Sequence, residues 1–173
     1  MGQSVDVTSR ILETFFDTPE DARIPIVTFN DLPMDELRDL IDWILIKHPT
    51  WVVGAICREG VLINRTEKRL SGRHNSRVQS LLRNPKLDLL IAEYTEEILQ
   101  KEGLFYDKSN VVILDNPTPT EMMLTRDIFD STPVIINQDR EVSIRNQGLI
   151  ERYTLGEHES FYRVYWKEIS AVI

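Results

Sequence analysis

Short apolar runs that alternate with amphipathic stretches constrain this chain more than any other feature of its sequence. The runs are rich in Val, Ile and Leu, which is typical of strands that are buried on both faces of a sheet. They cover residues 24–29, 51–56, 87–92, 111–114 and 133–136. Parallel strands of this kind need crossover helices between them. The pattern therefore predicts an α/β fold, a three-layer sandwich in which helices cover both faces of a mainly parallel sheet.

Helices are predicted where apolar residues recur every three to four positions. The strongest pattern covers Met34–Lys47, directly after Pro33, and its apolar stripe consists of Leu37, Leu40, Ile41, Ile44 and Leu45. Further helices are expected over residues 6–16, 75–82, 95–102 and 120–129, the third closed by Gly103. Residues 61–63 are expected to pair with the run at 51–56. The tail, residues 161–173, alternates in part and predicts an edge strand.

The charge balance and the single cysteine exclude several classes of protein. The chain has 173 residues, of which 28 are acidic and 20 basic, so its formal net charge is −8. A nucleic-acid or membrane partner is therefore not expected. Cys57 is alone and the three histidines share no ligand spacing, so neither a disulfide nor a metal site is expected. The first residues lack a signal-peptide core, and we expect one cytoplasmic domain over residues 1–173.

The most distinctive stretch is residues 87–116, LDLLIAEYTEEILQKEGLFYDKSNVVILDN, which places Glu93, Gly103 and Asn116 between and after two apolar runs. The segment EGVLIN at 59–64 precedes this stretch, NPKLD at 84–88 overlaps its start, and NQD at 137–139 follows it. In this order and spacing the segments resemble the ATP-dependent Mur ligase-like region of cyanophycin synthetase, over about residues 7–137. The resemblance implies a shortened Mur ligase central domain with a P-loop-NTPase-like sheet.

The resemblance ends where the family binds phosphate. There the family's first strand leads into G-T-N-G-K-T-T, whose amides, lysine and threonine hold phosphate and magnesium. This chain instead has NDLPMDEL at residues 30–37, so that Asp35 stands at the lysine position and Glu36 at the threonine position. Both loop glycines are replaced as well. Carboxylates at this place would repel a triphosphate, and we expect no ATP and no other cofactor to bind.

These losses make a pseudoenzyme the first functional hypothesis. It is a non-catalytic Mur ligase-like protein that acts as a binding, scaffold or regulatory module and has no catalytic residue. The family's carboxy-terminal ligase domain also has no counterpart in the chain. The alternative is a divergent ATP-dependent amide ligase-type enzyme, or a nucleotide-binding protein, with a weak residual site at Glu93 and Asn116. Glu93 follows a strand, where such folds place a magnesium ligand, but the preferred interpretation is a leftover solvated acid at a helix start.

Partners are predicted from charge and from aromatic residues. Between Arg65 and Lys86 the chain has seven basic residues and one acidic residue, Glu67, whereas the remainder is strongly acidic. Aromatic side chains gather in the tail, and aromatics are enriched at interfaces. The interface candidates are Arg73, Arg77, Phe161, Tyr165 and Trp166. We expect a homo-oligomer, with a dimer as the default, or docking to an acidic protein.

Overall fold

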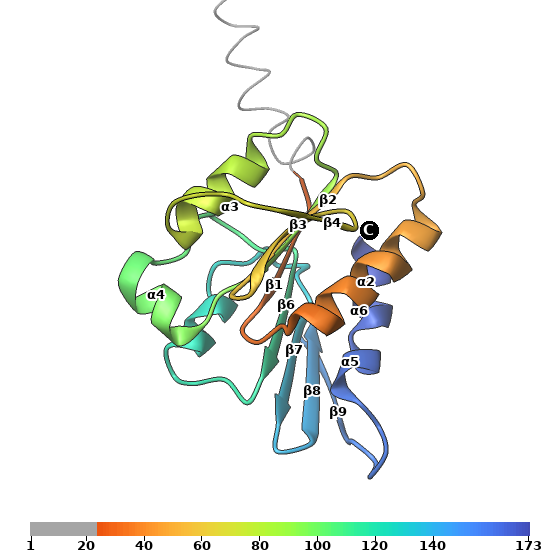
Figure 1. The fold of residues 1–173 in the computed structure, drawn as a ribbon. Helices are drawn as coiled ribbons and strands as arrows, with labels where there is room; N and C mark the ends of the chain where they lie inside the picture. Colours follow the sequence, from red (N-terminus) through yellow and green to blue (C-terminus); the bar gives the residue numbers. More distant parts are fainter. Residues whose placement is uncertain (1–23) are drawn as a thin grey trace, which may run out of the picture.

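Nine strands form one sheet through the centre of the molecule (Figure 1). The structure, a computed structural model, describes residues 24–173, except for the side chains of Tyr162 and Arg163. The central strands are parallel and follow the spatial order β2 (Val53–Cys57), β5 (Leu89–Glu93), β1 (Ile26–Phe29), β6 (Val111–Asp115) and β7 (Val134–Gln138). Antiparallel strands extend both edges: β3 (Gly60–Ile63) and β4 (Thr66–Lys68) beyond β2, and β8 (Glu141–Asn146) and β9 (Leu149–Thr154) beyond β7.

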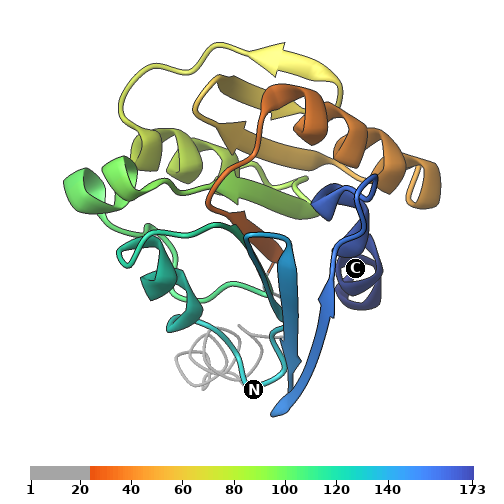
Figure 2. The same ribbon diagram turned by 90° about the horizontal axis from the view of Figure 1, so that it is seen from below.

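Helices cover both faces of the central strands, as the view along the sheet shows (Figure 2). One face carries α2 (Met34–Lys47), α5 (Phe161–Val164) and α6 (Trp166–Val172). The other carries α3 (His74–Leu82), α4 (Glu96–Glu102) and the 3-10 helix η1 (Glu121–Thr125). The predicted α/β class is therefore confirmed, but the expectation of a mainly parallel sheet is not. The four central pairings are parallel, and the four edge pairings are antiparallel.

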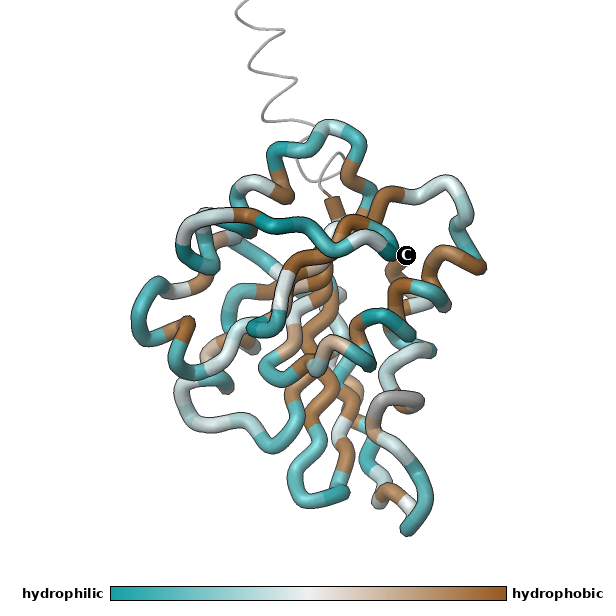
Figure 3. Tube along the Cα trace, viewed as in Figure 1, coloured by the Kyte–Doolittle hydropathy of each residue, from teal (hydrophilic) through white to brown (hydrophobic). Residues whose placement is uncertain are grey.

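Each face of the sheet has its own hydrophobic core. Along β5, Leu89 and Ile91 belong to the core under α2, whereas Leu90 and Ala92 belong to the core under α3 and α4. Successive side chains of a strand point to opposite faces, so a strand that serves two cores must be apolar throughout. This explains the continuous apolar runs, which form the hydrophobic centre of the trace in Figure 3.

Helix α2 forms where the apolar stripe predicts it. All five residues of that stripe are buried, and Pro33 stands at the N-cap position. The helix ends at Lys47, before His48 and Pro49. It has 14 residues, and within residues 24–173 no helix is long and apolar enough to cross a membrane.

The tail is the clearest correction to the sequence prediction. Residues 161–173 were expected as an edge strand, but they fold into α5 and α6. Tyr165 and Ile169 are four positions apart and both are buried against the sheet, so the apolar spacing is helical. Residues 161–173 thus contain both a partial strand-like alternation and a helical spacing of apolar residues, and the chain follows the helical spacing.

Other differences concern short polar elements. The helix expected over residues 120–129 is only the 3-10 turn η1, and the helix expected over 6–16 lies outside the described residues. Strands β4, β8 and β9 were not expected: every residue of β4 and β9 is exposed, and β8 buries only Val142 and Ile144 in the core. Gln147 and Gly148, with φ of 51° and 84°, form the two-residue turn that pairs β8 with β9.

Replacing Ile91 by alanine tests the order of the sheet. Ile91 is fully buried on β5, opposite Val27 of β1 and Ala55 of β2. The Ile91→Ala variant should lose about 2–5 kcal/mol of unfolding free energy, because it leaves a cavity in a packed core. Ile46→Ala is the matched control, since Ile46 is 75% exposed on α2 and its loss should cost less than about 0.5 kcal/mol. Equal denaturant midpoints for the two variants would show that β5 is peripheral.

Candidate functional site

A cavity of about 450 Å³ lies at the carboxyl ends of β1, β6 and β7. After β1 the chain turns to α2 on one face of the sheet, whereas after β6 it turns to η1 on the other face. Connections that diverge in this way leave a crevice between neighbouring strands, where open α/β sheets bind their ligands. The cavity is therefore the candidate functional site.

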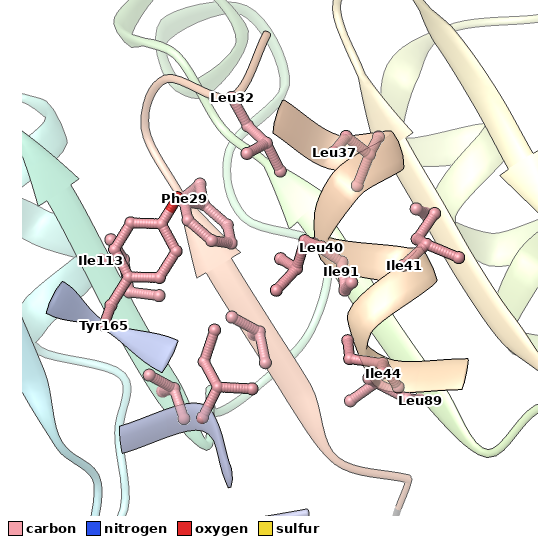
Figure 4. Packing of buried hydrophobic residues seen from close by; sticks show 14 of the residues in the cluster. Phe29, Leu32, Leu37, Leu40, Ile41, Ile44, Leu89, Ile91, Ile113 and Tyr165 are labelled. Atoms are coloured by element: carbon pink, nitrogen blue, oxygen red, sulfur yellow. The ribbon is translucent and has the colours of Figure 1, made fainter. Parts of the chain in front are cut away.

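The inner wall of the cavity is aromatic. Phe29 comes from the end of β1 and Tyr165 from the residue before α6, and their rings meet edge to face with centroids 5.3 Å apart. Figure 4 shows these two rings beside Ile113 of β6. Phe161 continues the wall, with its ring 5.4 Å from that of Tyr165. Helix α5 and the residue that joins it to α6 thus supply part of the site.

Acidic side chains surround the cavity opening. They are Asp31, Glu36, Asp115, Asp139 and Glu159. The pKa of Glu36 is raised by burial first and then by repulsion from Asp31 and Asp115, so these charges act on one another. Arg140, the single basic residue that lines the cavity, donates to the main-chain carbonyls of Gly156 and Glu159.

Glu93 lies deeper, at the end of β5, and it is completely buried. One carboxylate oxygen accepts from the main-chain N–H of Leu32 at 2.7 Å, and the other accepts from that of Arg58 at 2.7 Å. The guanidinium of Arg58 lies 3.5 Å from the same carboxylate and also pairs with Asp31 at 2.8 Å. Glu93 thereby joins the loop after β1 to the turn after β2, and its interpretation as a solvated acid is wrong.

Burial and hydrogen bonding act on Glu93 in opposite directions. Burial raises its pKa, and the amides of Leu32 and Arg58 and the charge of Arg58 offset this only in part. A buried carboxylate keeps its place only when its oxygens are satisfied by donors. Glu93 therefore needs both amides as hydrogen-bond donors, and both amides need Glu93 as their acceptor.

Internal carboxylates bind main-chain amides at the N-termini of all three helices at this edge. The pairs are Glu93 with Leu32 before α2 (2.7 Å), Glu59 with Met34 of α2 (3.3 Å), Glu102 with Asn75 of α3 (3.0 Å) and Glu121 with Glu96 of α4 (2.8 Å). Helix N-termini attract anions because their first amides have no partner within the helix. Here the chain's own acids satisfy amides at each of these N-termini.

Glu121 also lies at the edge formed by the carboxyl ends of the central strands, and the sequence analysis did not identify it. It is 7% exposed, and it accepts from Asn30 at 2.9 Å, from Thr118 at 3.1 Å and from Glu96. Asn30 in turn bonds both main-chain groups of Asp115. The segment Thr118–Glu121 has the spacing of a capping box, which was the one signal that could have found it.

The predicted site residues do not come together as one site. Asn116 lines the cavity, with φ of 44° and with its Oδ1 accepting from the amide of Asp139. Glu93 is not among the residues that line the cavity. The described residues contain no group of three or more His, Cys, Asp or Glu side chains that could hold a metal ion. The two predicted residues therefore do not line one cavity together.

The interface candidates are scattered over the surface and the core. Arg73 is exposed before α3, and Arg77 is half-buried on that helix. Tyr165 is 2% exposed and belongs to the core of the single chain. Trp166 is half-buried against Trp43, with ring centroids 4.8 Å apart, and Phe161 is also half-buried.

Comparisons with known proteins give little further information. No protein-family model and no curated protein matches this chain. Among solved structures, UDP-N-acetylmuramoyl-L-alanyl-D-glutamate–2,6-diaminopimelate ligase, a Mur ligase, is similar with a TM-score of 0.41 and 11% identity. The similarity covers 82% of this chain and 40% of that ligase, so the chain spans less than half of the ligase's length.

Replacing Glu93 by alanine tests its structural role. The variant leaves the amides of Leu32 and Arg58 without an acceptor, and each unsatisfied amide costs about 1–3 kcal/mol. We expect Glu93→Ala to lose at least about 2 kcal/mol of unfolding free energy. Glu97→Ala is the matched control, because Glu97 is 78% exposed on α4, and its stability should be unchanged. Equal urea midpoints for both variants would contradict the bridging role.

Proposed function

We propose that this chain is a non-catalytic binding or scaffold module, a Mur ligase-like pseudoenzyme that does not bind ATP. The observation that carries the proposal is that the chain's own carboxylates bind amides at or near the helix N-termini. Glu59, Glu102 and Glu121 each bind the first or second amide of α2, α3 or α4, and Glu93 binds the amide of Leu32, two residues before α2. A phosphate group needs such amides as donors, and here it would have to displace a carboxylate of the chain itself. At Leu32 it would also leave one carboxylate oxygen of the buried Glu93 without its main-chain donor.

The local sequence adds repulsion to this lack of donors. Asp35 and Glu36 lie in the first turn of α2, and Asp31 precedes it. Pro33 has no N–H to offer. A triphosphate placed at this helix would thus face three carboxylates, with Arg58 as a cation already paired to Asp31 and Glu93. The geometry supports a protein that uses the edge at the carboxyl ends of its central strands (the carboxyl edge) for something other than nucleotide chemistry.

The alternative is a divergent ATP-dependent amide ligase-type enzyme or nucleotide-binding protein that uses Glu93 and Asn116. It requires Glu93 to release both amides before it could bind magnesium. It also requires a phosphate to enter a cavity opening lined by Glu36, Asp115 and Asp139. Both steps are unfavourable, which is why we prefer the non-catalytic role.

Titration with ATP and magnesium decides between these functions. We expect no heat of binding in calorimetry and no change in Tm at millimolar ATP with excess magnesium, because the amide donors are occupied. A magnesium-dependent rise in Tm that Asn116→Ala removes would establish the residual-site alternative. Asn116 is exposed, so this variant tests ligand binding without removing a buried side chain. Asp107→Asn, an exposed acid that does not line the cavity, serves as the control.

A scaffold role also implies self-association, and strand β9 is the surface that supports it. All six of its residues are exposed, with Leu149 at 75% and Ile150 at 53%. Among the described residues the strand lies at the edge of the sheet, beyond β8, and its outer main-chain groups have no neighbouring strand. Edge strands with exposed apolar side chains pair with other chains unless charges or a proline protect them. Leu149 and Ile150 are apolar, and Glu151 and Arg152, which follow them, give the strand one charge of each sign. We propose that a second copy of the chain covers β9 in a dimer.

Light scattering at micromolar concentration tests the dimer. We expect about twice the 20.2 kDa of one chain, and a concentration-independent single-chain mass would contradict the proposal. Ile150→Lys should shift the protein toward the monomer, because a lysine on an edge strand opposes pairing. Ile46→Lys is the matched control, since Ile46 is equally apolar and 75% exposed but lies on α2. If Trp166→Ala dissociates the dimer instead, the contact lies at α6.

A further inference from the structure

The charges around the cavity at the carboxyl edge are not balanced. Within residues 24–173, Glu36 and Asp139 have no ion-pair partner. The side chain of Asp115 accepts only from neutral amide groups. The guanidinium of Arg140 is directed to two main-chain carbonyls rather than to a carboxylate. A cavity with this excess of negative charge attracts a cation and repels an anion.

A buried amide oxygen adds an independent requirement for a donor. Asn137 is the last residue but one of β7, is 7% exposed and lines the cavity. Its Nδ2 donates to Asp115 at 2.9 Å, whereas its Oδ1 is buried and has no hydrogen-bond partner among the described residues. Buried acceptors are almost always satisfied in folded proteins. A ligand that brings an N–H group into the cavity would supply the missing donor.

The inner wall fits the same kind of ligand. Phe29, Phe161 and Tyr165 line the cavity on this side. Because Phe29 and Tyr165 are each 2% exposed, the aromatic surface open to an alkyl chain or an ammonium group comes mainly from the half-buried Phe161. A cavity of about 450 Å³ is far larger than a bare ion and is in the range of small-molecule sites. The described residues also lack a group of side chains arranged for a metal ion.

We propose that this cavity binds an alkylammonium group, with the N–H donors directed to Asn137 and the acidic side chains and the alkyl chain against the aromatic wall. The proposal rests on the binding role inferred above, and it names the chemical class of the ligand. The group has two possible sources, a free aliphatic amine or the lysine side chain of a protein. In both cases the same carboxylates, amide oxygen and rings recognise it.

A titration with putrescine at low ionic strength tests this assignment. We expect saturable binding in calorimetry, with amide NMR shifts at Asn137, Asp139 and Phe161. The neutral analogue 1,4-butanediol has the same chain length and should not bind. Glu36→Gln and Asp139→Asn together should weaken putrescine binding by about tenfold, a change of about 1.4 kcal/mol. The control Asp107→Asn should leave it unchanged, because Asp107 does not line the cavity.

Three outcomes would overturn the inference: equal binding of 1,4-butanediol, undiminished binding by the Glu36 and Asp139 double variant, or binding of magnesium chloride but not of putrescine. The two acids are partly or fully exposed, so their variants should fold, and a wild-type thermal unfolding curve verifies this. A Gly-Lys-Gly peptide with blocked termini distinguishes the sources. Its affinity is compared with that of putrescine, the free amine of the titration. Tighter binding of the peptide indicates a lysine side chain as the natural ligand, and tighter binding of putrescine indicates a free amine. If putrescine does not bind at all, the inference about the cavity is also overturned. The ATP result is unaffected by this outcome, so the two proposals can fail separately.

Discussion

The hydrogen bond from the Leu32 amide to the carboxylate of Glu93 is the contact on which the carboxyl edge depends. It joins β5 to the loop after β1, and the second oxygen of the same carboxylate joins β5 to the turn after β2. One buried side chain therefore holds three neighbouring strands at the end where an α/β sheet forms its site. Burial disfavours the charged form of Glu93. The carboxylate therefore stays in this position only while the amides of Leu32 and Arg58 both donate to it.

This interaction changes what the fold can do at its edge. A helix N-terminus that binds a phosphate needs amides without another acceptor. In this chain internal acids satisfy amides of that kind at α2, α3 and α4, so the edge is stabilised from within. The negative charge that remains around the cavity then favours cations. Two sets of carboxylates thus act at this edge: Glu59, Glu93, Glu102 and Glu121 bind main-chain amides, and Glu36, Asp115 and Asp139 line the cavity.

The sequence predicts the centre of the fold well and its periphery poorly. The central strands and α2 were evident because burial on both faces, or along one stripe, leaves a strong apolar pattern. Strand β9 has no such pattern, since all six of its residues are exposed and its position is set by pairing with β8. In the tail, Tyr165 and Ile169 fit a helix while their neighbours suggest a strand, and packing against the sheet decides.

The candidate site was predictable only in part. The position of Glu93 after an apolar run marked it as a residue of the carboxyl edge, but sequence alone could not show that two amides hold it. Glu121 and Asn137 reach the edge from segments far apart along the chain. Such contacts depend on strand order, which no local pattern reveals. The sequence shows Asp35 and Glu36 directly after the first strand, but it does not show that Glu59, Glu93, Glu102 and Glu121 bind main-chain amides near the helix N-termini.

Amide NMR of Leu32 and Arg58 during a pH titration tests the central claim most directly. If Glu93 holds both amides, their resonances should shift together with one midpoint, above the pKa of 4.5 of an ordinary glutamate. They should also exchange slowly with solvent and stay unchanged when ATP and magnesium are added. Amides that exchange freely, or that shift with the nucleotide, would contradict the account.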